Sequence, residues 1–297
     1  SVAGSQRVYR QRIKSTQTLK KMFRAMELIA ASRIGRARAE AQAAVPFSRA
    51  ITRALSAAAT HADVDHPLTS ERSDTNKVAV LVLTADRGMA GAYNASVLRE
   101  AERLLARLAE AGKEPQLYIA GRRGVGYFTF RHREMVRTWL GDSDRPDLDR
   151  AEDIATTLLE AFQASAAEGG VSEIHLVYTR FLSMVTQEPR VVRILPLEVV
   201  DGVAPAGEEP LPLYDFEPSP EVVLDALLPR YILARIFTAL HQAAASELAS
   251  RQRAMHTATE NAEDIIRNYT RLANSARQAE ITQEISEIVS GADALAS

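Results

Sequence analysis

The sequence predicts two long helices, one at each end of the chain, that pair antiparallel, with an α/β domain and a mostly parallel sheet between them. Two observations lead to this fold class. Long proline-poor stretches with helical spacing of apolar residues occupy both ends. Short apolar segments alternate with helical ones in the middle. The chain has 297 residues, of which 46% are hydrophobic and 25% charged, so it is long enough for more than one domain.

Residues 1–60 are predicted to form the first long helix. No proline precedes Pro46, where we expect a kink. The apolar positions recur mostly in steps of three and four, which is typical of a narrow coiled-coil seam. They are Ile13, Leu19, Met22 or Phe23, Met26, Ile29 and Ile34.

Residues 220–297 are predicted to form the second long helix. Ser219, Pro220 and Glu221 suit an N-cap, a first helical position and a first-turn acid. We expect a kink or short break at Pro229 and the end of the helix at Gly291. Two helices from opposite ends, each with one narrow apolar stripe, can bury those stripes on each other only as an antiparallel pair. Membership of an ordinary helical bundle remains the alternative.

The middle of the chain, residues 77–200, reads as an α/β domain of the Rossmann-like kind. Strands are predicted at KVAVLVLT, QLYIAG, SEIHLVYTRF and PRVVRILPL, with helices at 95–111 and 149–167. The last two strands are separated by only seven residues, LSMVTQE, so we expect them to pair antiparallel. Residues 61–76 form a polar connector and residues 201–219 a proline-rich linker.

The composition excludes several classes of site. The chain contains no cysteine, so disulfides and thiolate metal sites are excluded. The six histidines are scattered, and no serine stands in a G-x-S-x-G elbow. A cation site in the loop HADVDH (61–66) is less favoured than a solvated connector. We therefore predict no catalytic residue, no metal site and no cofactor, and a chain that is not itself an enzyme.

The stretch TADRGMAGAYN (84–94) raises the alternative of a nucleotide-binding Rossmann-type enzyme. It has strand, turn and helix in the right order, but Gly88 and Gly91 give only part of a phosphate-binding pattern. No lysine follows, and Asp86 would repel a phosphate. The second glycine cluster, GRRGVG (121–126), also lacks phosphate-binding companions. We interpret both as strand-to-helix turns that need small residues for close backbone approach.

The N-terminal helix is strongly basic although the whole chain carries a net charge of only −2. Lysines and arginines are frequent from Arg7 to Arg38, and Glu27 is the single acid among residues 1–38. No aromatic residues are interleaved as in single-strand binding. The face therefore suits an acidic protein partner at least as well as nucleic acid, and a basic coiled coil that binds nucleic acid is the second alternative. No apolar run approaches the ~20 residues that span a bilayer, so we expect a cytosolic chain.

Four separated motifs carry a resemblance to one family. ARQAEITQEISEIVSGADA (276–294) resembles the C-terminal signature of the gamma subunits of F-type ATP synthases, with Ile281, Thr282, Glu284, Glu287 and Gly291 at its core. AMELIAASRI (25–34), RIKSTQTLKK (12–21) and TADRGMAGAYN (84–94) resemble other blocks of the same family, in the same order.

The resemblance implies a fold and a function. The terminal helices would form an asymmetric left-handed coiled coil inside an alternating alpha/beta hexamer, in one copy per complex. The middle domain would lie against the epsilon subunit and the membrane c-ring. The chain would then be a peripheral, non-catalytic subunit at the cytoplasmic face of a bacterial cell membrane. It would transmit c-ring rotation to the beta subunits for ATP synthesis or hydrolysis, bind no nucleic acid, and reach the membrane only through the c-ring.

The resemblance also implies which residues meet partners. Met26 would face an acidic lever of beta, while Arg277 and Gln278 would hydrogen-bond a catch loop of beta. A further set would couple with the Met26 region: Arg251, Thr282, Glu284 and Glu287. Tyr214 and Glu217 match the foot of the subunit near the c-ring and epsilon.

Overall fold

The computed structural model describes residues 2–61, 66–67, 70, 72–197 and 219–296. They divide into two compact units, one of residues 1–30 with 251–297 and one of residues 31–250. Helix α1 (Val2–His61) and helix α5 (Pro220–Ala296) each contribute to both units. The boundaries of the units therefore fall inside the terminal helices rather than at the connectors.

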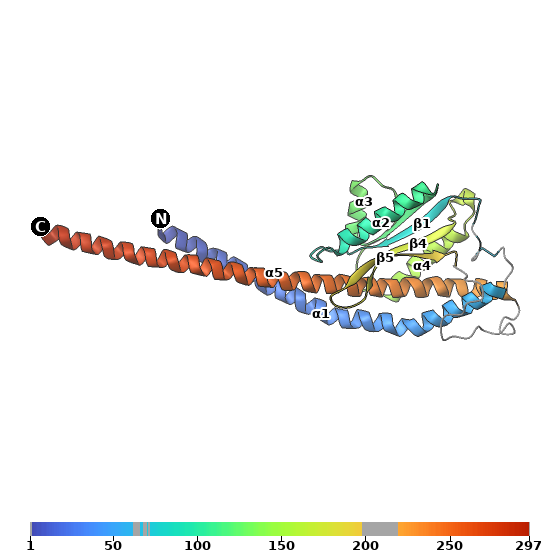
Figure 1. Cartoon of the computed structure of the whole chain (residues 1–297), viewed down its shortest axis with the longest axis horizontal. Coiled ribbons are helices and arrows are strands. Elements are labelled where there is room, and N and C mark those ends of the chain that lie inside the picture. Colours follow the sequence, from blue (N-terminus) through green and yellow to red (C-terminus); the bar gives the residue numbers. More distant parts are fainter. Residues whose placement is uncertain (1, 62–65, 68–69, 71, 198–218, 297) are drawn as a thin grey trace. The chain divides into compact units, whose positions relative to one another are not determined.

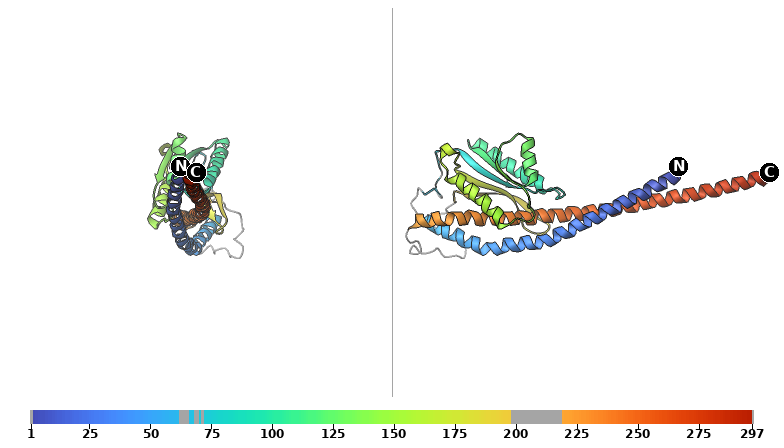
Figure 2. Two further views of the ribbon diagram at one scale, coloured as in Figure 1. Left: turned by 90° about the vertical axis from the view of Figure 1, so that its left-hand side faces the viewer. Right: turned by 180° about the vertical axis from the view of Figure 1, so that it is seen from behind.

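The first unit is an antiparallel pair of helices, drawn blue and red in Figures 1 and 2. Glu27 pairs with His256 at 2.9 Å, and Lys20 pairs with Glu263 at 3.2 Å. The partner's number rises as the number in α1 falls, which confirms the antiparallel arrangement predicted from the two stripes. The residues of α1 that turn inward are Gln6, Tyr9, Ile13, Thr16, Lys20, Phe23, Glu27 and Ala30. Those of α5 are Met255, Thr259, Ala262, Ile266, Tyr269, Ala273, Ala276 and Glu280.

These two sets alternate steps of three and four, the spacing of a coiled-coil seam. The predicted stripe of α1 was partly wrong, because Leu19 and Ile29 are 46% and 51% exposed. Of the alternatives Met22 and Phe23, Phe23 is the half-buried one, and Met26 is half-buried as well. The register of the two helices depends on every inward position of the repeat. Many of these positions hold polar or small residues, which cannot be identified from large apolar side chains alone. Several of the largest apolar residues of this part of α1 therefore face outward.

Both helices run through the residues expected to interrupt them. Pro46 lies inside α1 and Pro229 inside α5, so the short break expected at Pro229 is absent. The expectation that Gly291 ends α5 was also wrong, since the helix continues to Ala296. A glycine in a helix interior costs only about 1 kcal/mol relative to alanine, and the residues that follow include good helix formers.

The second unit contains a five-stranded sheet of order β3-β2-β1-β4-β5. Its strands are β1 (Lys77–Leu83), β2 (Glu114–Ala120), β3 (Met135–Trp139), β4 (Glu173–Phe181) and β5 (Gln187–Leu195). The pairs β3–β2, β2–β1 and β1–β4 are parallel, and β4–β5 is antiparallel. The mostly parallel sheet and its antiparallel last pair are as predicted.

Helices cover both faces of this sheet (Figure 1). Helix α2 (Tyr93–Glu110) and helix α3 (Arg122–Phe130) pack on the face formed by residues such as Val80, Val82 and Ile119. Helix α4 (Leu148–Gln163) packs on the opposite face, followed by the 3₁₀ turn η1 (Ala166–Glu168). There it shares one core with parts of α1 and α5 that lie in this unit. Burial of both faces explains why β1 reads as a continuous apolar run.

Helix α3 and strand β3 were absent from the sequence-based prediction. Helix α3 has only 9 residues, and its RRGVG start resembles a turn. Strand β3 has 5 residues with a mostly open face, and lies at the edge of the sheet. Both elements are too short for periodicity to distinguish them, and they form because the neighbouring strand β2 and helix α2 provide a surface to pack against.

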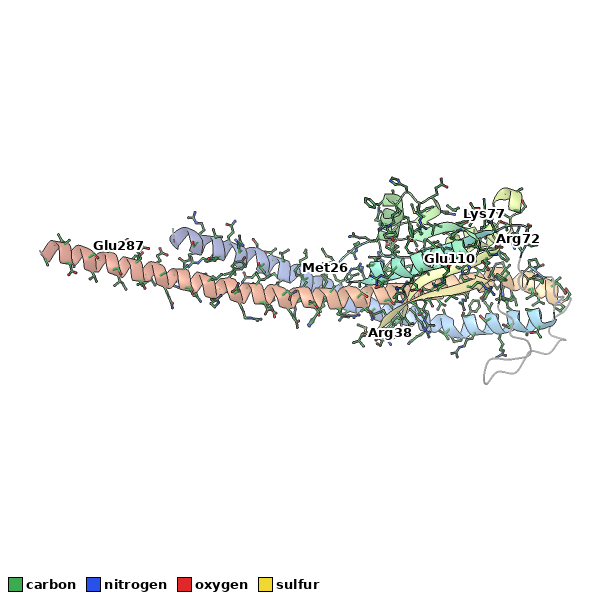
Figure 3. The ribbon with its side chains drawn as sticks, turned by 45° about the horizontal axis from the view of Figure 1, so that its top comes forward. Met26, Arg38, Arg72, Lys77, Glu110 and Glu287 are labelled. Atoms are coloured by element: carbon green, nitrogen blue, oxygen red, sulfur yellow. The ribbon has the colours of Figure 1, made fainter. Side chains whose placement is uncertain are left out.

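Arg72, labelled in Figure 3, fixes the start of β1 to the end of α4. Its Nη1 group lies 3.1 Å from the carbonyl oxygens of Phe162 and Ala164 and 3.2 Å from that of Val171. Its other nitrogens donate to the carboxylate of Asp74. The last carbonyls of a helix have no partner within the helix, so a cation placed among them supplies donors that would otherwise be missing.

Replacing Arg72 by methionine, which keeps an apolar stem and removes the guanidinium group, is expected to lower the free energy of unfolding by about 2–3 kcal/mol. Chemical denaturation of the purified chain measures this. Arg103→Met is the matched control, because Arg103 is an exposed arginine whose ion pair with Glu100 is worth at most ~1 kcal/mol. Equal effects of the two substitutions would contradict the role given to Arg72.

Candidate functional site

The turn after β1 is organised by the carboxylate of Asp86. It accepts hydrogen bonds from the backbone N–H groups of Arg122 at 3.1 Å, Gly141 at 3.0 Å and Ser143 at 2.9 Å. Burial raises the pKa of Asp86, but these donors outweigh it, so the pKa lies below its ordinary value. The carboxylate thus accepts an N–H group at the N-terminus of α3, the kind of donor that binds a phosphate in dinucleotide folds.

The glycines of the second cluster serve close packing against Thr84. Gly121 has a φ of +99°, and a Cβ atom there would collide with the Thr84 carbonyl. A Cβ atom on Gly124 would lie 2.7 Å from Thr84 Oγ1. That hydroxyl donates to the Ala120 carbonyl at 2.7 Å and accepts from the Gly124 N–H at 3.0 Å. The prediction that these glycines allow close backbone approach is confirmed at the two positions, but only Gly121 lies in a turn, because residues from Arg122 onward form helix α3.

Asp144 is a residue whose role the sequence did not suggest. Its Oδ2 atom lies 2.7 Å from Arg33 of α1 and 3.1 Å from Arg87 of the turn after β1. The Asp144 side chain is 13% exposed, so both pairs are partly shielded from water. One carboxylate therefore joins α1, the β1–α2 turn and the β3–α4 loop. The D-R-G motif gives no signal for this contact, because Asp144 lies in a loop with no recognisable pattern.

Met26 lies on α1 in the helix pair, half-buried, and is labelled in Figure 3. Apolar side chains nearby face outward, notably Leu28 at 61% and Ile29 at 51% exposure. Basic residues Lys21 and Arg24 are also exposed on this part of α1. An exposed mixture of large apolar and cationic groups is typical of a surface that binds another protein.

The residues of α5 that are predicted to contact beta differ in their exposure. Arg277 and Gln278 are exposed, whereas Arg251 is only 3% exposed and lies within the packing of the chain itself. Thr282 and the nearby Glu284 and Glu287 are all exposed. These exposures describe the chain alone, and the partner contacts of all these residues stay predictions.

The last part of α5 has no partner helix among the residues that the structure describes. The side-chain NH₂ group of Gln6 in α1 donates to the carboxylate of Glu280 at 3.1 Å, and its amide oxygen accepts from Arg10. Beyond this contact every residue from 281 to 296 is exposed. Ile281, Ile285 and Ile288 are spaced by four and three residues, so they form one apolar stripe with exposures of 46%, 56% and 70%.

Met26 and the Thr282–Glu287 segment are not brought together. Because Glu27 pairs with His256, Met26 lies near the middle of α5. Thr282 lies roughly 40 Å farther along α5 at ~1.5 Å per residue, and Figure 3 shows Met26 and Glu287 well separated. Any coupling between these positions must therefore pass along the helix pair rather than through a contact.

Two predictions fall on residues that the structure does not describe. Tyr214 and Glu217 lie in the segment 198–218, and two residues of the HADVDH loop that could hold a cation, Asp63 and Asp65, are in the segment 62–65. His66, the last residue of that loop, is 9% exposed and its Nε2 lies 3.3 Å from Asp225 of α5.

Among the residues that the structure describes, no three histidine, aspartate or glutamate side chains gather as metal ligands do. Within the same residues, none of the helices combines the length and apolar character needed to cross a bilayer.

Asp86→Asn is expected to lower the free energy of unfolding at pH 7 by about 1.5–3 kcal/mol, because charge-assisted hydrogen bonds become neutral ones. A carboxylate with a lowered folded-state pKa stabilises above its unfolded pKa of ~3.9, and this contribution is lost as the pH falls through the folded value. The difference between the two proteins in denaturant melts should therefore be constant from pH 7 to pH 5 and shrink below pH 4. A difference that stays unchanged at pH 3 would contradict this assignment.

Comparison with known proteins gives one consistent result. A family model described as ATP synthase matches residues 5–295. The chain is 76% identical over 295 residues to the ATP synthase gamma chain of Beutenbergia cavernae, covering 99% of both chains. It is 58% identical over 296 residues to that of a Nocardioides species, covering 99% of this chain and 98% of that one.

Solved structures share the fold at low identity. A chain in the mitochondrial ATP synthase of Euglena gracilis matches with a TM-score of 0.68 and 15% identity, over 99% of this chain and 95% of that one. A chain in the central stalk and c-ring assembly of the Tetrahymena thermophila enzyme matches with a TM-score of 0.58 and 18% identity, over 80% of this chain and 99% of that one. With a family model matching nearly the whole sequence and full-length relatives above half identity, the chain belongs to the ATP synthase gamma chain family.

Proposed function

We propose that this chain is the central rotor shaft of a proton-translocating F-type ATP synthase, which carries rotation of the membrane c-ring to the catalytic beta subunits. The names of its full-length relatives support this. The structural observation that carries it is the uneven helix pair. Residues 281–296 extend α5 past its contact with α1 and expose an apolar stripe. Such a stripe is stabilised when a surrounding assembly covers it.

The mechanism depends on asymmetry about the axis of the helix pair. A partner can shift a conformational equilibrium only if it contacts the alternative states differently. One helix ends early and the other continues, and the first 30 residues of α1 are basic while residues 281–296 contain Glu284, Glu287, Asp293 and no base. A rotating pair of this kind presents a different face to each beta subunit in turn, and the free energy passes as torque through the packed seam.

The partners that we propose are an alpha/beta hexamer around the helix pair, with epsilon and the c-ring against the α/β domain. One copy of the chain serves each complex, at the cytoplasmic face of the membrane and without a span of its own. Tyr214 and Glu217 are proposed contacts with the c-ring or epsilon. These assignments rest on the family resemblance, and the exposed basic surface of α1 supports an acidic protein partner.

Co-purification tests the proposal directly. An affinity tag on the α/β domain, expressed with the other synthase subunits of the same organism, is expected to recover an alpha/beta hexamer and a small epsilon-like subunit at one tagged chain per hexamer. Quantitative mass spectrometry measures the ratio. Recovery of the chain without the hexamer, with a bound dinucleotide, or with nucleic acid in a salt-sensitive complex would favour the alternatives raised by the sequence.

Met26→Lys is expected to lower coupling while the complex still assembles. The added cation would pair too strongly with the acidic lever that we propose on beta, so ATP would be hydrolysed with less proton pumping. The ratio of ATP-driven proton pumping to ATP hydrolysis in membrane vesicles measures this. Met184→Lys is the matched control, because it places the same charge on an exposed methionine of the α/β unit. An unchanged ratio for Met26→Lys would refute the assignment.

Arg277→Ala is expected to slow ATP hydrolysis by the assembled complex by roughly tenfold, because an arginine hydrogen bond to a charged partner is worth about 1.5–3 kcal/mol. Steady-state turnover of purified complexes measures the effect. Arg271→Ala removes an equally exposed arginine from α5 that already contacts Asn268. Arg277→Ala is expected to slow turnover more than Arg271→Ala does. Normal turnover of Arg277→Ala would count against a catch-loop contact.

A further inference from the structure

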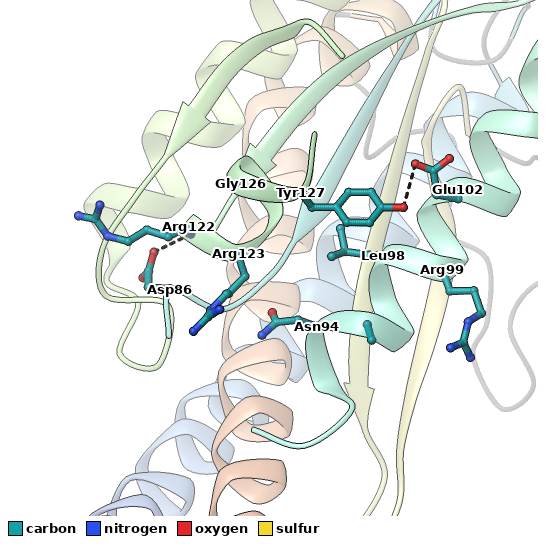
Figure 4. A pocket seen from close by; sticks show the side chains of 10 residues that line it. Asp86, Asn94, Leu98, Arg99, Glu102, Arg122, Arg123, Gly126 and Tyr127 are labelled. Atoms are coloured by element: carbon teal, nitrogen blue, oxygen red, sulfur yellow. Dashed lines mark hydrogen bonds between the residues drawn. The ribbon is translucent and has the colours of Figure 1, made fainter. Parts of the chain in front are cut away.

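A groove beside the Asp86 turn contains none of the residues to which the rotor function assigns a partner contact. It lies between α2 and α3, has a volume of about 830 Å³, and is shown in Figure 4. This volume is within the range of sites that hold small organic ligands. The groove lies on the face of the sheet away from α4.

The side-chain groups of the groove that can still form hydrogen bonds with a ligand are mainly donors. Arg99 of α2 and Arg123 of α3 line it, and neither guanidinium group has an ion pair within the described part of the chain. Asn94 contributes an amide whose oxygen already accepts from the Ala85 N–H at 2.9 Å, which leaves its NH₂ group directed to the groove as a donor. In Figure 4, Asn94 and Arg123 lie at one end and Arg99 at the other.

The two carboxylates of the groove are already occupied. Asp86 accepts from three backbone N–H groups, and Glu102 accepts from the Tyr127 hydroxyl at 3.3 Å and from Arg133 at 3.1 Å. Neither carboxylate is therefore a ready partner for Arg99 or Arg123. An incoming ligand would meet cationic and amide donors, and anionic oxygens are the groups that satisfy them.

The floor between the two arginines is apolar. Leu98 and the ring of Tyr127 lie between Asn94 and Arg99 in Figure 4, and Ala95 completes this wall. A bare inorganic anion would leave this surface exposed to water, whereas a ligand with an apolar or planar part would cover it.

We propose that this groove binds a phosphorylated small molecule of nucleotide size, with its phosphate oxygens on Arg123 and Asn94. Its organic part would lie over Leu98 and Tyr127 toward Arg99. This is a different position from the phosphate site of a dinucleotide fold, because Asp86 already occupies the N-terminus of α3. The proposal assigns the ligand no chemical step.

One charge-assisted contact from Arg123, one neutral hydrogen bond from Asn94 and cover of the apolar floor correspond to a Kd of about 0.1–1 mM. The purified full-length chain is titrated calorimetrically with ADP and, separately, with inorganic pyrophosphate. ADP is expected to bind about tenfold more tightly than pyrophosphate, because only ADP can cover the apolar floor. Binding is expected to weaken as salt is added.

Arg123→Gln is expected to weaken ADP binding about tenfold, and Arg99→Gln by a smaller factor, because of the two arginines only Arg123 contacts the phosphate. Arg107→Gln is the matched control, since Arg107 is an exposed arginine in the last turn of α2 that does not line the groove. Circular dichroism melts establish that each variant is folded.

Saturable ADP binding that Arg107→Gln leaves intact and either groove variant weakens would support the proposal. The proposal is overturned if titration with ADP gives no saturable heat up to about 5 mM, five times the upper limit of the expected Kd. Equal losses of ADP affinity in all three variants would also overturn it. If pyrophosphate binds as tightly as ADP, the role proposed for the apolar floor is wrong. If the chain binds an aspartate-rich peptide and not ADP, the groove is reassigned to a protein partner. The measurement uses the chain alone, so it stands or fails independently of the rotor function.

Discussion

The seam between α1 and α5 is the constraint on which the first unit depends. Most helical stability in proteins comes from packing of an apolar face, so the two helices depend on the seam that they share. The 3-4 repeat of small, polar and apolar residues brings the two backbones together and aligns Glu27 with His256 and Lys20 with Glu263. The contacts of the seam reach Gln6 and Glu280, and Ile281, Ile285 and Ile288 beyond them have no cover in the described chain.

The first turn of the α/β domain shows how a nucleotide-like framework is stabilised from within. In dinucleotide folds the N–H groups at the start of a helix bind a phosphate. Here the Asp86 carboxylate receives such a group from Arg122, together with N–H groups from the loop after β3. An internal anion turns what could be a ligand site into a joint between β1, α3 and that loop, and Asp144 extends the joint to α1 through Arg33.

The two units differ in how far their charged and apolar groups are exposed. In the second unit the central strand β1 is buried on both faces, whereas the edge strand β3 leaves Val136 55% exposed. In the first unit only the inward positions of the repeat are covered, and Leu28 and Ile29 remain exposed beside Lys21 and Arg24. The apolar burial that this unit lacks is what the proposed hexamer would provide.

The sequence by itself determined the periodic features: both long helices, their antiparallel pairing, strands β1, β2, β4 and β5, and the family resemblance. Such features are repeated over many residues, so local pattern is enough to reveal them. It also indicated that the glycines of GRRGVG allow close backbone approach, although it missed that residues 122–126 begin helix α3. Tertiary structure decided the rest. The register of α1 depends on the partner helix, the short α3 and β3 depend on their neighbours, and the contacts of Asp86, Asp144 and Arg72 join residues far apart in the chain. No local pattern encodes such contacts, since each exists only once the sheet has brought its loops to the same edge.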